Sequence, residues 1–184
     1  MNLEINHIFL FVHLVSLIVG FGSVIVIDTF GLLWLLKKVK LSFVNQVANT
    51  TQPLIWIGWT GLVLTGVPLI LMKDAISGLS TIKIFAVLMV GLNGVFLHLI
   101  KKSMASITDD MEMPNLAKFR ITLATFVSQA GWWTAIVIGF LNNKLKSDAP
   151  VIDHPFYIII PVFISILGIL IVGELAMKAN MLRD

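Results

Sequence analysis

The chain contains no cysteine, and this absence excludes several kinds of chemistry. Without thiols there can be no disulfide, thiolate metal site, iron–sulfur cluster or covalently attached haem. Any haem would therefore be a b-type haem, held by histidine, methionine or lysine side chains. Charge is scarce as well: Asp, Glu, Lys and Arg make up 12% of the residues, against about 25% in soluble domains. The chain is too poor in charge for a soluble protein.

Several motifs that identify a catalytic or binding activity are also missing. The sequence has no phosphate-binding loop, no nucleophile motif, no HExxH zinc motif and no nucleic-acid-binding module. We therefore expect no nucleic-acid partner. Whether the protein is an enzyme stays open.

Long apolar runs fill the chain instead. Hydrophobic residues make up 58% of the 184 residues, and the mean hydropathy is +0.96. A helix that crosses the hydrocarbon core of a bilayer needs about 20 mainly apolar residues. Five segments meet this requirement, at approximately 8–36, 53–72, 84–100, 121–141 and 155–176. We predict an all-α fold, a polytopic bundle of five membrane helices that forms a single transmembrane domain over residues 1–184 and contacts the lipid bilayer.

The basic residues indicate how the chain is oriented. Most of the 13 Lys and Arg residues follow the first segment, separate the third segment from the fourth, or follow the fifth. Because cytoplasmic loops carry an excess of Lys and Arg, we predict an N-terminus outside and a C-terminus inside a bacterial cytoplasmic (inner) membrane. Five helices can pack against one another only in part, which is compatible with a homodimer.

Turn and cap residues predict two helix starts. Pro53 is expected in the first turn of the second helix, where a proline is tolerated. Ser80 or Thr81 is expected to cap the third helix, because a hydroxyl can accept a bond from the first backbone N–H groups.

Six polar residues interrupt the apolar segments, and a polar group in hydrocarbon needs a partner and often has a function. They are His13, Asp28, Lys83, Asn93, His98 and Gln129. His13 shares one helix face with Ser16, Gly20 and Ser23, at about 100° per residue. This face could line the bottom of a cavity in which His13 binds a haem iron or a metal ion. It could equally pack against a neighbouring helix, with His13 hydrogen-bonded at the interface.

Asp28 is expected to have a partner near the inner surface. His98 should lie at a similar depth, because the first and third helices run in the same direction, and the two side chains could form a carboxylate–imidazole pair. An ion pair of Asp28 with Arg120 or Lys101 is the alternative.

Small and amide side chains predict how the helices pack. Asn93 and Gln129 lie near mid-membrane in the third and fourth segments, where an amide pair would join the two helices. A narrow stripe on the second segment would let another helix approach closely, and consists of Gly58, Gly61, Thr65 and Pro68.

Three larger side chains have two interpretations each. Lys83 opens the third segment, where it could contribute to a cofactor site or act as an anchor whose ammonium reaches the membrane surface. Trp132 and Trp133 lie mid-helix rather than in an interfacial belt. They could pack against a planar ligand such as haem, a quinone or a tetrapyrrole, or they could fill a core.

A resemblance to known membrane proteins rests on short motifs in about the first 100 residues. The run from His13 to Gly22, followed by Asp28 and by leucines leading into Lys37 and Lys38, resembles the opening helix of copper-resistance D type proteins and of bacterial membrane protoporphyrinogen oxidase. Thr65-Gly66 and Lys83 continue it. The stretch 93–97 is also similar to a group of uncharacterised bacterial membrane proteins. The resemblance implies a helical bundle that binds haem or another tetrapyrrole, with His13 and Lys83 at the site.

Three functions are consistent with these observations. The first is a membrane protein that binds b-type haem or another tetrapyrrole for redox chemistry or haem handling, with His13 as the best ligand and Lys83, His98 or a methionine as candidate partners. The second is a small permease for a metal ion or small solute. Its path across the bundle would be marked by His13, Asn93, Gln129, Asp28 and His98. The third is a non-catalytic membrane subunit or scaffold.

Overall fold

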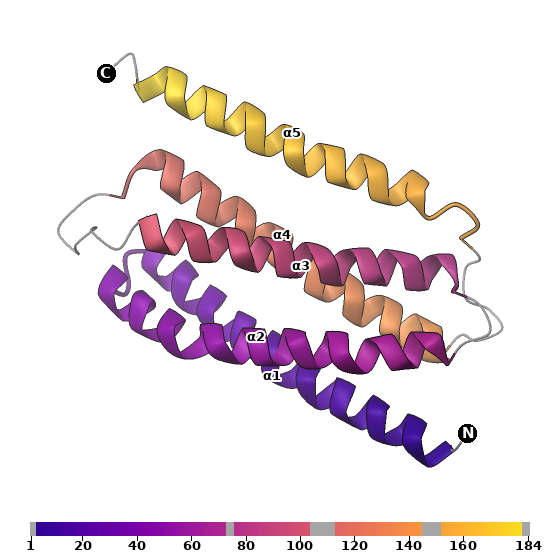
Figure 1. The fold of residues 1–184 in the computed structure, drawn as a ribbon. Coiled ribbons are helices and arrows are strands. Elements are labelled where there is room, and N and C mark those ends of the chain that lie inside the picture. The colour runs from indigo at the N-terminus through magenta and orange to yellow at the C-terminus, as the bar shows by residue number, and fades with distance from the viewer. Residues whose placement is uncertain (1–2, 73–75, 104–112, 145–151, 182–184) are drawn as a thin grey trace. The chain divides into compact units, whose positions relative to one another are not determined.

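The chain forms five long α-helices (Figure 1) in the computed structural model, which describes residues 3–72, 76–103, 113–144 and 152–181. The helices are α1 (Leu3–Leu35), α2 (Leu41–Leu71), α3 (Gly78–Ser103), α4 (Asn115–Lys144) and α5 (Phe156–Met181). Each is long and apolar enough to cross a membrane, and the described residues contain no strand. The predicted all-α, multi-pass membrane fold is confirmed. The direction of the chain across the bilayer and its location in a bacterial inner membrane stay predictions.

The start of α2 differs from the prediction, because the helix begins well before Pro53 and contains it. The polar residues ahead of the proline do not interrupt the helix, and the hydroxyls of Thr50 and Thr51 bond to carbonyl oxygens one turn earlier in it. Thr51 Oγ1, for example, donates to the carbonyl oxygen of Val47 at 3.0 Å. The ring of Phe43 also packs edge-on against Phe30 of α1, with ring centroids 5.3 Å apart. This contact packs the early part of α2 against α1.

The start of α3 is also earlier than predicted, and its cap is Ser77. The Oγ of Ser77 accepts the backbone N–H of Ser80 at 3.2 Å, the geometry of an N-cap. The two hydroxyl oxygens lie 3.0 Å apart. The predicted cap at Ser80 or Thr81 is therefore wrong, because both residues already lie inside α3.

The helices group into two compact units. The first unit contains α1 and α2, which run antiparallel along each other as a hairpin (Figure 1). The second unit contains α3, α4 and α5. That the two units form one transmembrane domain stays a prediction.

The hairpin is held by a very close approach of the two helix backbones. A Cβ built on Gly58 of α2 would collide with the backbone of Gly20 in α1 and would lie 2.7 Å from the carbonyl oxygen of Ser16. A Cβ on Gly61 would likewise collide with the Ser16 hydroxyl. The small-residue stripes predicted on the two helices therefore face each other, as in close helix pairs of membrane proteins.

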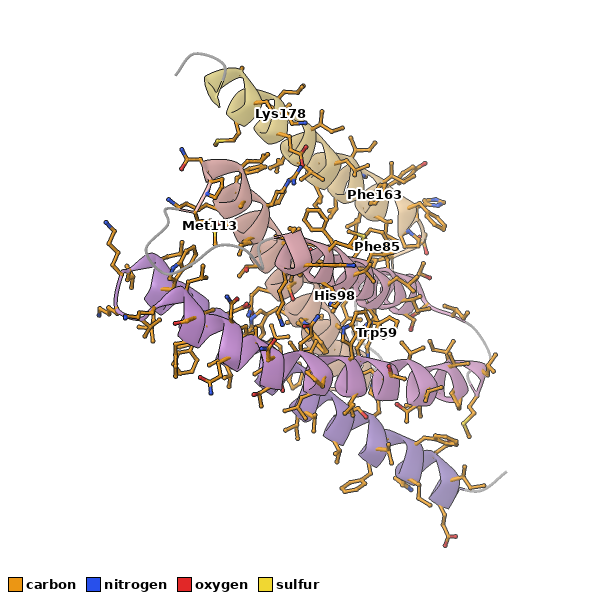
Figure 2. All side chains as sticks on the ribbon, turned by 60° about the vertical axis from the view of Figure 1, so that its left-hand side comes forward. Trp59, Phe85, His98, Met113, Phe163 and Lys178 are labelled. Atoms are coloured by element: carbon orange, nitrogen blue, oxygen red, sulfur yellow. The ribbon has the colours of Figure 1, made fainter. Side chains whose placement is uncertain are left out.

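In the second unit, α3 and α4 form the better-packed pair. A Cβ on Gly131 of α4 would lie 2.6 Å from Val90 Cγ2 and 3.3 Å from the carbonyl oxygen of Ala86, so these helices also meet at a glycine. Helix α5 is the least buried, since none of the residues in its most apolar window is buried. Figure 2 shows one of its contacts, between Phe163 and Phe85 of α3, whose rings are at 80° with centroids 6.4 Å apart.

The turn between α1 and α2 contains an unusual backbone conformation. The N–H of Lys38 bonds to the carbonyl oxygen of Leu33, and the N–H of Lys37 to that of Trp34, both at 2.8 Å. This pair of bonds defines a Schellman motif, whose left-handed position is usually glycine. Here the residue is Lys37, with a φ of 58°.

Replacing Lys37 with glycine should raise the free energy of unfolding by about 0.5–1 kcal/mol. The left-handed conformation costs a non-glycine residue about 1–2 kcal/mol, and the greater freedom of glycine in the unfolded chain offsets part of that gain. The measurement is unfolding of the purified protein by SDS titration. Lys38→Gly is the matched control, since it removes the same charge next to the strained position and should not stabilise. Equal stability of the two variants would contradict the interpretation.

Candidate ligand site at His13

His13 lies in the interface between α1 and α2, where its imidazole is tied to the second helix. Its Nδ1 is 2.8 Å from the hydroxyl oxygen of Thr65. The ring is half-buried. This bond matches one of the two interpretations of His13, an interface histidine with a hydrogen-bond partner, and it also fixes the direction of the ring.

The neighbouring bonds assign the imidazole tautomer. The Thr65 hydroxyl has a single hydrogen, and its oxygen lies 2.6 Å from the carbonyl oxygen of Gly61, which can only accept. The hydroxyl therefore donates to Gly61 and accepts from His13. We assign the imidazole proton to Nδ1, which leaves the lone pair of the ring on Nε2.

The second helix also supports the ring from the side. A Cβ built on Gly66 would lie 3.5 Å from Cε1 and 3.9 Å from Nδ1 of His13, so the imidazole edge rests beside the glycine at ordinary contact distance. Thr65 and Gly66, adjacent in the chain, thus provide one polar and one steric contact. Together they hold the imidazole in a single orientation.

This arrangement resembles the way proteins prepare a histidine to bind a metal. A ligating imidazole usually donates its second ring N–H to an oxygen, which fixes the tautomer and makes the other nitrogen more basic. The bond from His13 to Thr65 supplies such an oxygen. Among the described residues, no group of three or more His, Asp or Glu side chains lies close enough together to hold a metal ion.

The partner of Asp28 stays a prediction. Arg120, one of the candidates, pairs with Glu174 of α5: its Nε donates to Oε1 at 2.8 Å, and a second guanidinium nitrogen lies 2.7 Å from the same oxygen. Lys178, one helical turn after Glu174, has its ammonium 3.9 Å from Oε2 of the same carboxylate. His98, labelled in Figure 2, belongs to the other unit from Asp28, so their pairing stays a prediction.

The amide pair takes a different form from the predicted one. The buried Asn93 donates from Nδ2 to the backbone carbonyl oxygen of Ala124 at 2.8 Å. The bond joins α3 to α4, as the predicted contact with Gln129 would have done, but its acceptor is a backbone atom. Asn93 thus links two helices, which is the common use of an intramembrane amide.

Lys83 and the two tryptophans lie on the pair α3 and α4. The Lys83 ammonium nitrogen is 3.5 Å from the position of a Cβ on Gly139, so its side chain extends along α4. Trp132 is 2% exposed and fills the core of its unit, whereas Trp133 is 52% exposed. Adjacent helix positions point about 100° apart, and the two rings do not share one face. Contact of Trp133 with a planar ligand stays a prediction.

The sequence singles out His13 as a candidate but does not reveal which residue bonds to it. Thr65 was recognised only as part of a small-residue stripe, and its bond to His13 spans 52 positions in the chain. The Arg120–Glu174 pair was missed in the same way, with a separation of 54. In both cases the available signal was a polar side chain inside an apolar helix.

Comparison with known proteins finds no matching family model, no matching curated protein and no matching solved structure. The resemblance to copper-resistance D type proteins and to protoporphyrinogen oxidase therefore stays a prediction.

Proposed function

We propose that the protein is an integral membrane protein that binds b-type haem or a related metallo-tetrapyrrole, with His13 Nε2 as an axial ligand. The observation that carries this proposal is the bond from His13 Nδ1 to the Thr65 hydroxyl at 2.8 Å. That bond leaves the lone pair on the nitrogen that would face an iron, and it holds the ring in place. The absence of cysteine limits the haem to the non-covalent, b type.

A single oriented histidine suits a haem better than a bare metal ion. The porphyrin itself supplies four nitrogen ligands, so one protein nitrogen is enough to hold and tune the iron. A bare ion would need several ligands from side chains. When bound, the iron would supply one-electron chemistry, and the protein would supply the axial nitrogen and an apolar surrounding.

The cheapest test is the absorption spectrum of the purified protein after expression with haem supplied. We expect a Soret band that is shifted relative to haem in the same detergent and that saturates at one haem per chain or per fixed oligomer. His7→Ala is the matched control: it removes another imidazole from α1, six positions away from His13, and should leave the band unchanged. A wild-type spectrum indistinguishable from free haem in detergent would overturn the proposal.

A second candidate function, a non-catalytic membrane subunit, is favoured by the same bond. His13 satisfies Nδ1 within the α1–α2 interface, and an interface polar residue often only joins two helices. In this case the bond would stabilise the hairpin and no ligand signal would depend on it. Stability and haem binding, measured on the same variants, separate the two functions.

A permease function stays a prediction. Of the polar residues expected along its path, His13 and Asp28 lie in the first unit, and the others lie in the second. Asn93, in the second group, is already bonded to the backbone of α4.

A further inference from the structure

The turn between α1 and α2 concentrates positive charge. Lys37, Lys38 and Lys40 are all exposed, within four consecutive positions. Between Asp28 and Asp74 the sequence has no acidic residue, so no neighbour along the chain neutralises these charges. The tip of the hairpin is therefore a compact cationic surface.

The start of α2 adds to this charge. Its N-cap residue is Lys40, which makes no side-chain capping bond, and its first turn has no acidic residue. The N-terminus of a helix carries partial positive charge from its backbone N–H groups. The ammonium groups and the helix terminus therefore both place positive charge in the turn between α1 and α2.

The backbone of the turn holds a lysine where glycine is usual. Lys37 has a φ of 58° in a turn closed by two hydrogen bonds. A strained residue that persists in a well-formed structure is grounds for a functional hypothesis. Here the residue that is retained despite the strain is a cation.

Apolar side chains flank the lysines and indicate how deep the turn lies in the bilayer. Leu35, Leu36 and Phe43 are exposed beside the turn, and Phe43 is braced by Phe30. Exposed apolar side chains next to lysines are typical of the boundary between hydrocarbon and headgroups, where the stems lie in the bilayer and the ammonium groups reach the phosphates.

We propose that this turn is a binding surface for the headgroups of anionic phospholipids, with Lys37, Lys38 and Lys40 as the contacts. The partner is the phosphate-bearing surface of the bilayer. A lysine near an anionic membrane surface strengthens the attraction to that surface by a factor of about five. The effect weakens as the salt concentration rises. The proposal does not depend on haem binding or on which end of the chain is outside.

The absence of native cysteine makes a local measurement straightforward. Val39→Cys places a single fluorophore in the turn, and Ile76→Cys places one at the exposed position that follows α2, far along the hairpin from the turn. Each protein is reconstituted in nanodiscs of phosphatidylcholine with phosphatidylglycerol, and energy transfer to acyl-labelled phosphatidylglycerol is compared with transfer to acyl-labelled phosphatidylcholine. We expect about threefold enrichment of phosphatidylglycerol at Val39→Cys and a ratio near one at Ile76→Cys.

Charge variants decide whether the three lysines cause the enrichment. Replacing Lys37, Lys38 and Lys40 by Gln should bring the ratio to about one, and replacing them by Arg should keep it. The matched control removes the same charge from the other unit by Lys102→Gln, Lys118→Gln and Lys178→Gln, and should leave the ratio unchanged. A wild-type ratio of one, an unchanged ratio in the turn variant, or an equal loss in the control would overturn the proposal. The Arg variant keeps the test decisive if the Gln variant does not fold.

Discussion

Replacing Gly58 with alanine is expected to lower the free energy of unfolding by about 3 kcal/mol, the upper part of the range for overpacked sites. The added methyl group would fall on the backbone of Gly20 and would lie 2.7 Å from the carbonyl oxygen of Ser16. Backbone atoms cannot turn away as a flexible side chain can, so α1 and α2 would have to separate. Separation would also remove neighbouring contacts, including the bond between His13 and Thr65.

The matched controls for this prediction are Gly22→Ala and Gly31→Ala. A Cβ at either position would meet no atom within 4 Å. Alanine is favoured over glycine inside a helix by about 0.8–1.0 kcal/mol, so both variants should be as stable as the wild type or more stable. SDS titration of the purified proteins measures the difference. If Gly58→Ala unfolds at the same SDS concentration as the controls, the backbones of α1 and α2 do not approach each other closely at Gly58.

Much of the fold follows directly from the sequence. Long apolar segments require helices in a bilayer, because backbone N–H and C=O groups have no water to bond to. The stripe of Gly58, Gly61 and Thr65 correctly predicted a closely packed face. The helix ends were less predictable: α2 begins at Leu41, ahead of Pro53, where Phe43 packs against Phe30 of α1.

The site was harder to predict than the fold for a definite physical reason. A helix period says which residues of one helix share a face, but not which residue of the next helix lies opposite. That register is set where Gly58 meets Gly20, and it places Thr65 opposite His13. The same limitation explains why the pairing of Arg120 with Glu174 was missed, because Glu174 lies on a helix whose register against α4 no local pattern reveals. Next to this ion pair, the ring of Phe119 lies against Gly173, where any Cβ would collide with the ring.

His13→Ala should abolish the Soret shift expected for the wild type, and Thr65→Val should weaken haem binding by about 10–100-fold. The first variant removes the axial nitrogen. The second keeps the size of the side chain but removes the oxygen that accepts from Nδ1, and loss of such an outer partner typically costs that factor in affinity. Thr65→Ser keeps the hydroxyl and should retain most of the affinity. Haem titration followed at the Soret band measures all three.

Thr29→Val is the matched control, because the Thr29 hydroxyl is exposed and bonds to the carbonyl oxygen of Ile25 in its own helix at 2.7 Å. It removes the same group from the same unit and should leave haem affinity unchanged. The non-catalytic alternative predicts a different pattern: Thr65→Val would lose about 1 kcal/mol of stability, the usual contribution of one hydrogen bond, while no protein in the series would bind haem. Unchanged haem affinity in His13→Ala would instead assign the ligand to another residue.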